Sequence, residues 1–348
     1  MIKEKIDSSV KIWLWTGFIM ILVQVLIGGV TRLTGSGLSI TKWDIITGTI
    51  PPLGVSEWIE AFDAYKATPQ YQKINEGMSL YEFKFIYFWE YFHRLWARLM
   101  GFVFILPLIY FLIRKMIPGW LKTRLLIVFL LAGLVASFGW IMVASGLVER
   151  PWVSAYKLSF HLTLAVVLLA YLFITILNSY KINTVKNSRL FRFSVLLSIG
   201  IFLQIFLGGM VSGMKAALLY PTFPDMKGNF VPDVLYHSSY WSVDNLIHYE
   251  KSPFFPSLVH FLHRIWAYVL VILSSSFIYR LRNVQLPRYL SYSQIMLIIV
   301  LIIQIILGIL TVINSQGTVP VGLGVMHQIC GILFFVTSLI FSFGFRKG

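Results

Sequence analysis

The stretch IMLIIVLIIQIILGILTVI, residues 295–313, runs for 19 positions without a charged side chain. A helix of about 20 apolar residues crosses the hydrocarbon core of a bilayer, so this stretch alone predicts a membrane span. Similar runs occupy residues 99–113, 125–148, 162–177 and 193–211. Only 12% of the 348 residues are charged, whereas soluble proteins carry about 25%. A soluble fold, a coiled coil and a disordered chain are therefore excluded, and the sequence predicts a polytopic α-helical membrane protein.

Hydropathy, together with the charges that flank each run, predicts eight transmembrane helices. They are expected at residues 11–30, 86–113, 124–146, 156–178, 191–213, 257–280, 291–314 and 321–344. The fold class is all-α, with the eight helices forming two pseudo-symmetric four-helix bundles. The first bundle is expected in residues 1–180 and the second in residues 181–348. Two external segments, 31–85 and 214–256, are rich in Pro, Gly and aromatic residues and are expected to be ordered caps.

Basic residues are concentrated on one side of the predicted membrane. Loops on the side of the two termini hold 16 basic residues against two acidic ones, Glu4 and Asp7, a net charge of +14. The opposite loops hold 10 basic and 11 acidic residues, a net charge of −1. Because cytoplasmic loops are enriched in Lys and Arg, both termini are predicted to be cytoplasmic. The basic excess is thus a topology signal, and it gives no support to nucleic-acid binding.

The first apolar run is long and lacks the small-residue cleavage pattern of a signal peptide, and no Arg-rich transit peptide is recognisable. We therefore expect a multi-pass protein of a bacterial inner membrane. The one cysteine, Cys330, excludes an internal disulfide and a thiolate metal cluster.

The two predicted halves repeat one another. Gln24-Val-Leu-Ile-Gly-Gly-Val in the first span matches Gln204-Ile-Phe-Leu-Gly-Gly-Met in the fifth. His93-Arg-Leu-Trp-Ala in the second span matches His263-Arg-Ile-Trp-Ala in the sixth. Because each half has an even number of spans, the halves are expected to be parallel repeats about an axis along the membrane normal. The paired glycines suit close helix contact, with ordinary packing as the simpler explanation.

Ionisable side chains inside a membrane are costly and indicate function. Four of the seven histidines lie inside predicted spans at repeat-related positions: His93, His161, His263 and His327. Each lies a few helical turns inside its predicted span. At a rise of 1.5 Å per residue, this corresponds to a depth of roughly 9–14 Å below the external membrane surface. The four are expected in one layer near the external surface, two in each bundle. We expect His260 to be structural or to line a pocket, and His237 and His248 to be ordinary loop histidines.

Two histidines on facing helices of a four-helix bundle suit axial ligation of a heme iron. Zinc would need three or four ligands on one centre, usually with a carboxylate or a thiolate. We therefore predict that His93 and His161 bind one heme iron and that His263 and His327 bind a second.

Arginines accompany the predicted ligands. Arg94 and Arg264 directly follow a histidine, and Arg98 lies one turn after Arg94. Guanidinium groups near the external rim can pair with heme propionates. The alternative, snorkelling to the membrane interface, weighs most for Arg98.

Glu90 breaks the symmetry of the two halves. It precedes His93 by three residues, so on a helix it projects from the same face, and the equivalent position in the second half is His260. A carboxylate beside one heme only suggests that one half is catalytic and the other transfers electrons. The alternative is a structural carboxylate paired with Arg94 or Arg98.

Several stretches around these residues resemble heme A synthase, in the long-loop class of mitochondria and many Gram-negative bacteria. The matching stretches are Gly28-Gly-Val-Thr-Arg-Leu-Thr-Gly-Ser-Gly-Leu-Ser39, Trp43, Gly48-Thr-Ile-Pro-Pro-Leu53, Glu57-Trp58, Glu82-Phe-Lys-Phe-Ile-Tyr-Phe-Trp-Glu-Tyr-Phe-His-Arg94, Thr222-Phe-Pro-Asp-Met-Lys-Gly228 and His263-Arg264. The resemblance covers nearly the whole chain. The chain lacks the external cysteine pairs of the short-loop class, and His260 stands where the family pattern has glutamine.

The resemblance implies oxidation of the C8 methyl of heme O to the formyl group of heme A, by successive hydroxylations and loss of water. The residues that it implies for a resident heme b cofactor are His263, His327 and Arg264. Those that it implies for the heme O substrate are His93, His161, Arg94 and Arg98. Glu90 would be the catalytic acidic residue, either as a general base towards water or by stabilising a cation on the methyl carbon.

Two other functions are compatible with four membrane histidines. A di-heme b-type electron carrier or quinol oxidoreductase explains the histidines but leaves Glu90 and the first-loop motif unexplained. A heme transporter would need an opening path and no resident heme. A heme A synthase would contact membrane lipid and supply cytochrome c oxidase, so heme O synthase and oxidase assembly factors are expected partners. No nucleic-acid partner is expected, and one sequence leaves a homo-oligomer open.

Overall fold

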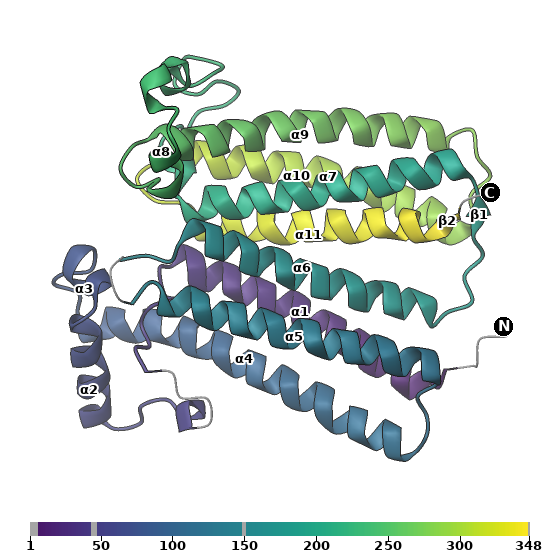
Figure 1. Ribbon diagram of the computed structural model, residues 1–348, viewed down its shortest axis with the longest axis horizontal. Helices are drawn as coiled ribbons and strands as arrows, with labels where there is room; N and C mark the ends of the chain where they lie inside the picture. The colour runs from purple at the N-terminus through teal and green to yellow at the C-terminus, as the bar shows by residue number, and fades with distance from the viewer. Residues whose placement is uncertain (1–5, 43–46, 148–150, 347–348) are drawn as a thin grey trace. The chain divides into compact units, whose positions relative to one another are not determined.

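Eight long helices dominate the computed structural model, which describes residues 6–42, 47–147 and 151–346 (Figure 1). They are α1 (Ser8–Leu33), α4 (Leu80–Ile113), α5 (Gly119–Ala144), α6 (Ala155–Asn178), α7 (Ser188–Gly213), α9 (Phe254–Leu281), α10 (Arg288–Ile313) and α11 (Val321–Gly344). All eight are long and apolar enough to cross a membrane. The prediction of an all-α polytopic membrane protein with eight spans is confirmed.

Polar residues outside the apolar runs cap the starts of α1 and α4. α4 begins at Leu80 rather than at residue 86, because Ser79 and Glu82 form a capping box. The Ser79 amide donates to Glu82 Oε2 at 2.8 Å, and the Glu82 amide donates to Ser79 Oγ at 3.3 Å. Asp7 caps α1 by accepting a hydrogen bond from the Ser9 amide at 2.8 Å. Hydrogen bonds from the Ser9 hydroxyl and amide hold the pKa of the Asp7 carboxyl below its ordinary value.

Proline marks several helix starts and one helix interior. The residues just before α5, α9, α10 and α11 are Pro118, Pro253, Pro287 and Pro320. Pro107 lies inside α4 and lacks the amide that would reach the carbonyl of Val103, four residues earlier. Trp13 of α1 supplies the missing donor, since its Nε1 lies 3.0 Å from the Val103 oxygen. The carbonyl that Pro107 leaves without a helical hydrogen bond thus forms a contact between α4 and α1.

The chain divides into two compact units, residues 1–172 and 173–348, with the boundary inside α6. The first unit contains α1, α4, α5 and most of α6. Gly17 of α1 allows two other helices to approach, since a Cβ there would lie 3.4 Å from Phe104 of α4 and 3.6 Å from Leu172 of α6. The second unit contains α7, α9, α10 and α11, and α11 packs against both α7 and α10.

Two hydrogen bonds recur at equivalent positions of the two units. One joins a glutamine side-chain amide to a histidine carbonyl: Gln24 to His93 at 3.1 Å, and Gln204 to His263 at 2.9 Å. The other joins a tryptophan indole to a carbonyl of a neighbouring helix: Trp96 to Met20 at 3.0 Å, and Trp266 to Gly200 at 2.8 Å. The repeat in the sequence is therefore also a repeat in the structure.

Short elements fill the segments between the spans. The segment between α1 and α4 contains η1 (Thr47–Thr49), α2 (Val55–Lys66) and α3 (Pro69–Lys73). The segment between α7 and α9 contains η2 (Ala216–Leu218), η3 (Asp233–Tyr236), η4 (Ser238–Tyr240) and α8 (Val243–Ile247). Phe62 and Tyr65 of α2 stack on Phe83 of α4, with ring centroids 4.9 and 5.2 Å from it. Strand β1 (Val185–Lys186) pairs in parallel with β2 (Phe345–Arg346). Trp43 of the first-loop motif lies outside the described residues.

Candidate functional site

His263 of α9 and His327 of α11 face each other in the second unit. Their ring centroids lie 6.4 Å apart, and the ring planes are inclined by 75°. A metal–imidazole bond is about 2 Å long, so two such bonds and the two ring radii together span roughly 6 Å. An iron atom bonded to both rings therefore fits between them, and paired imidazoles are suitable axial ligands of heme iron. Within the described residues, no three His, Cys, Asp or Glu side chains are grouped to hold a metal ion.

His93 of α4 and His161 of α6 form the corresponding pair in the first unit. Both histidines lie in the first unit, so each predicted pair of ligands lies within one unit. Ligation of one iron by His93 and His161 stays a prediction.

Each of these histidines packs against a glycine on another helix. A Cβ on the glycine would lie within close range of the ring: Gly28 to His93 at 3.1 Å, Gly139 to His161 at 3.0 Å, Gly208 to His263 at 3.3 Å, and Gly308 to His327 at 2.9 Å. Such distances leave little or no room for a side chain, so the close approach requires glycine. The four glycines therefore help to set where the rings lie.

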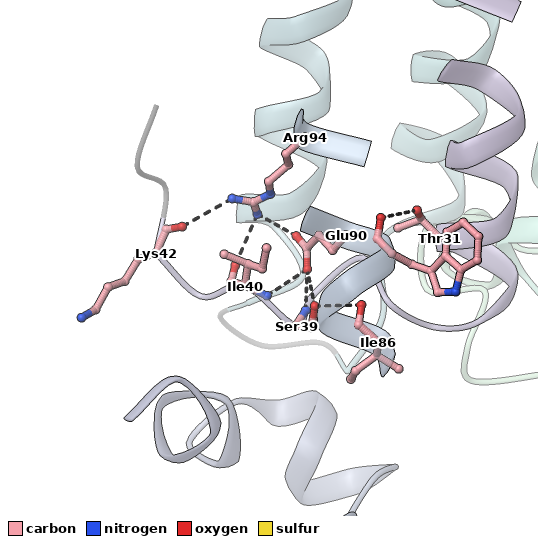
Figure 2. A network of polar contacts seen from close by, with 8 residues as sticks. Thr31, Ser39, Ile40, Lys42, Ile86, Glu90 and Arg94 are labelled. Carbon is pink, nitrogen blue, oxygen red and sulfur yellow. Dashed lines mark hydrogen bonds and ion pairs between the residues drawn. The ribbon is translucent and has the colours of Figure 1, made fainter. Parts of the chain in front are cut away.

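Glu90 is buried in α4, with 3% of its surface exposed. Its Oε2 accepts hydrogen bonds from the Ser39 amide at 2.7 Å, the Ser39 hydroxyl at 2.8 Å and the Ile40 amide at 2.8 Å. Its Oε1 forms an ion pair with Arg94 at 2.6 Å. Figure 2 shows the Glu90 carboxylate between the loop that carries Ser39 and Ile40 and the Arg94 guanidinium. Three donors converge on Oε2 and one on Oε1, so contacts at both oxygens fix the orientation of the carboxylate.

The first-loop motif folds back on itself to deliver these donors. Gly35 has a φ of 71°, in the left-handed region that favours glycine, and turns the chain just after α1. The Gly35 carbonyl accepts a hydrogen bond from the Gln70 side chain at 3.0 Å. Thr31 Oγ1 donates to the Trp89 carbonyl at 3.2 Å, tying the end of α1 to α4 (Figure 2). The first-loop motif therefore holds Ser39 against the Glu90 carboxylate of α4.

Arg94 and Arg264 bind backbone carbonyls of the segments that follow α1 and α7. Arg94 donates to Ile40 and Lys42 at 3.3 and 3.4 Å, and Arg264 donates to Tyr220 and Asp225 at 2.9 and 2.8 Å. Arg98 lies one turn further along α4 and is partly buried. Pairing of the three arginines with heme propionates stays a prediction, and a guanidinium has five N–H donors to divide between loop and ligand.

His260 takes the place of Glu90 in the second unit. Arg264 Nε donates to His260 Nε2 at 3.1 Å, at the same four-residue spacing as the pair of Glu90 and Arg94. Only 1% of the His260 surface is exposed. In both units an arginine therefore contacts the side chain four residues before it and the carbonyls of the segment that follows α1 or α7. The contacted side chain is a carboxylate only in the first unit.

Known proteins match the chain along almost its whole length. The family model COX15-CtaA, described as cytochrome oxidase assembly protein, matches residues 11–339. Heme A synthase of Nitrosospira multiformis is 39% identical, over 99% of this chain and 96% of its own length. The chain belongs to the heme A synthase family. Heme A synthase of Brucella anthropi is 40% identical over 95% of this chain and 90% of its own, and that of Bradyrhizobium diazoefficiens is 39% identical over 93% and 88%.

Membership of the heme A synthase family confirms the resemblance that the sequence indicates, and these relatives give no support to the di-heme electron carrier. Sequence reasoning missed that Ser39 and Ile40 bind Glu90, although Ser39 ends the quoted motif. It also missed that Gly139 and Gly308 face histidines. The available signal was the Gln-x-x-x-Gly spacing of the first and fifth spans, which recurs at Gln304 and Gly308.

Proposed function

We propose that this heme A synthase family member oxidises the C8 methyl of heme O to the formyl group of heme A. Family membership makes the protein an oxidoreductase. The observation that carries the specific reaction is an asymmetry between two otherwise repeated sites: Glu90 is buried beside one histidine pair, and His260 occupies its place beside the other. An electron carrier needs ligands in both halves, but it has no need of a carboxylate in one.

The reaction has three chemical stages. A first hydroxylation converts the methyl group to an alcohol, a second gives a geminal diol, and loss of water leaves the formyl group. With water as the oxygen donor, each hydroxylation releases two electrons and two protons, and the electrons would leave through the heme held by His263 and His327 to an acceptor outside the protein. The protein must therefore hold the same substrate in one place through two successive oxidations, which suits a site built on fixed helices rather than on mobile loops.

The two halves divide the work. In residues 181–348, His263 and His327 would hold a resident heme b, with Arg264 at its propionates. That heme supplies a redox-active iron for electron transfer. In residues 1–180, the groups that would bind and orient heme O are His93, His161, Arg94 and Arg98. The 6.4 Å spacing of the His263 and His327 rings supports this ligand role in the second half.

Glu90 places a carboxylate in the substrate half and holds it in one orientation. Its Oε2 accepts three hydrogen bonds from Ser39 and Ile40, whereas its Oε1, among the described residues, accepts only the Arg94 contact and keeps a lone pair. The Arg94 guanidinium offsets part of the negative charge. Both roles considered for this carboxylate, a general base towards water and a stabiliser of a cation on the methyl carbon, are therefore compatible with the arrangement.

Heme analysis of membranes tests the function directly. In a host that makes heme O, membranes containing this chain should yield heme A, and membranes containing its His93→Ala variant should not. Hemes are extracted and separated by chromatography. Unchanged heme O with additional heme b would indicate the electron carrier, and absence of any resident heme in the purified protein would indicate the transporter.

We place the protein in a bacterial inner membrane with both termini in the cytoplasm. A reporter fused after Lys181 should therefore score as cytoplasmic, and one fused within 225–235 should score as external, because the charge asymmetry of +14 against −1 is large. Alkaline phosphatase activity, which requires export, measures the difference. High activity after Lys181 would invert the topology and place the histidine layer in the opposite leaflet.

The reaction also defines the partners. Heme O and heme A are membrane-soluble, so a heme O synthase upstream and assembly factors of cytochrome c oxidase downstream are the proteins with which this chain would exchange its substrate and product. Bilayer lipid surrounds the spans.

A further inference from the structure

Residues 50–55, in the segment between α1 and α4, form an exposed apolar stretch that we call the apolar finger. The exposed fractions of its aliphatic side chains are 68% for Ile50, 79% for Leu53 and 74% for Val55. Apolar side chains exposed together on a protein surface mark an interaction site. The finger overlaps Gly48–Leu53, one of the stretches that resemble heme A synthase, and the proposed reaction gives this stretch no task.

The backbone of the apolar finger presents few hydrogen-bond donors. Pro51 and Pro52 have no amide N–H. The amides of Leu53 and Gly54 both donate to Glu57 Oε2, at 2.6 and 3.2 Å. Each position from residue 51 to 54 therefore either lacks an amide proton or has a partner for it. An unsatisfied backbone donor is costly in lipid, so this backbone meets the condition for insertion into a membrane.

The apolar face of α2, the helix that follows the finger, is wider than the surface that it buries. Phe62 and Tyr65 lie at one edge of this face and stack on Phe83 of α4. Val55 and Ile59, one turn apart, lie at the other edge and are exposed. With about 3.6 residues per turn, the acidic residues of α2 fall outside the apolar face; they are Glu57, Glu60 and Asp63. Amphipathic helices that lie on a membrane surface have such a face.

A hydrogen bond attaches the finger to α4 at the level where the predicted span starts. The Tyr91 hydroxyl donates to the carbonyl of Thr49, directly before the finger, at 2.8 Å. Tyr91 follows the predicted start of the span at residue 86 by five residues, and the side chains of a helix lean towards its N-terminus. The finger is therefore held beside the first turns of the span. Phe85 and Phe88 in these turns are also exposed, and they continue the apolar surface along α4.

We propose that the apolar finger and Ile59 form a lipid-binding surface that inserts into the membrane at the side where α4 begins. The partner is bilayer lipid, and apolar faces of this kind enter the boundary between headgroups and acyl chains to a depth of about 5–10 Å. Insertion anchors the segment that also carries the hydrogen-bond donors to Glu90, and it helps to hold that segment against α4. The inference rests on the membrane spans and not on the proposed reaction.

Spin labelling of the full-length protein in vesicles of phosphatidylcholine and phosphatidylglycerol tests the insertion. The one native cysteine, Cys330, is buried, so a nitroxide reagent labels an introduced surface cysteine. Leu53→Cys and Val55→Cys place the label in the finger, and Ser56→Cys places it on the neighbouring exposed polar residue as the matched control. Electron paramagnetic resonance then compares collisions with oxygen, which concentrates in lipid, and with a water-soluble nickel chelate. We expect high oxygen and low nickel accessibility at positions 53 and 55, and the reverse at position 56.

A charge introduced into the finger provides a second test. Leu53→Asp should shift the equilibrium between inserted and free finger about tenfold or more towards the free form, because burial of one leucine contributes about that factor. The Val55→Cys label should then become accessible to the nickel chelate, whereas Ser56→Asp should leave it protected.

Two results would overturn the proposal. Nickel accessibility at positions 53 and 55 equal to that at position 56 would show that the finger lies in water. Protection from both oxygen and nickel would show that protein, either a second copy of the chain or another partner, covers the finger in place of lipid. If the Leu53 variants fail to fold, the Val55→Cys label alone distinguishes these results.

Discussion

A His327→Ala variant should lose the low-spin heme b spectrum almost completely. The His263 and His327 rings are spaced so that one iron atom can bind both, and removal of one ring leaves an open coordination position beside a cavity. A Cβ placed on Gly308 would lie only 2.9 Å from the His327 ring, which shows how closely α10 packs against the imidazole. Alanine fills little of that volume, so the remaining single ligand would hold the heme weakly. Optical and paramagnetic resonance spectra of the purified protein measure the loss.

His237→Ala is the control and should leave the spectrum unchanged, since His237 is exposed in the segment between α7 and α9. His93→Ala should keep heme b, because it alters only the first half. A full bis-imidazole heme b spectrum in His327→Ala would show that this histidine is not a ligand of the resident heme. Loss of heme b in His93→Ala instead would exchange the roles of the two halves.

The fold was predictable because membrane spans are encoded locally. Eight apolar runs in the sequence correspond to eight helices. Where helix starts differ from the prediction, they follow either a polar cap, as at Asp7 and Ser79, or a proline, as at Pro118, Pro253 and Pro287. The start of α4 illustrates this point: Glu82 and Lys84 lower the local hydropathy, so the predicted span begins at residue 86, but the capping box at Ser79 starts the helix earlier. Hydropathy detects the part of a helix within the lipid, and capping determines where the helix begins.

The candidate site was predictable only in part. The histidine pairs were predicted from the energetic cost of placing ionisable side chains in a membrane and from the internal repeat. Both features can be recognised in the linear sequence. The partners of Glu90 are not, because Ser39 and Ile40 lie about 50 residues away and reach the carboxylate only after the first-loop motif has folded. The ion pair with Arg94 was among the alternatives, since a spacing of four residues on a helix brings the two side chains together.

The second large effect is expected at Glu90. Glu90→Gln keeps the size of the side chain but removes its negative charge and the ion pair with Arg94. With its amide oxygen towards the Ser39 and Ile40 donors, the new amide nitrogen would face the Arg94 guanidinium, which is a donor and cannot accept its hydrogen bonds. We expect the variant to fold, to retain heme b and to bind heme O, since the histidine ligands are intact.

Conversion by Glu90→Gln should fall by about a hundredfold or more, the scale seen when one preorganised electrostatic contact to a transition state is removed. Heme O or its alcohol should then accumulate in place of heme A. Ser39→Ala is the matched variant: it removes the hydroxyl that lies 2.8 Å from Oε2 but leaves the carboxylate, the Arg94 pair and both backbone donors. If the charge itself acts on the methyl carbon, Ser39→Ala should convert heme O at nearly the wild-type rate.

Comparing Ser39→Ala with Glu90→Gln separates a catalytic role of Glu90 from a structural one. Both variants weaken the hydrogen-bond network around the carboxylate, but only Glu90→Gln removes the negative charge. Equal loss of conversion in Ser39→Ala and Glu90→Gln would show that Glu90 acts by holding the first loop against α4. Normal heme A production by Glu90→Gln would make the carboxylate purely structural, and loss of both hemes would show that it supports the helix pair on which the ligands stand. Failure of conversion in Glu90→Gln alone, with heme O bound and heme b in place, is the result that assigns the catalytic charge to this residue.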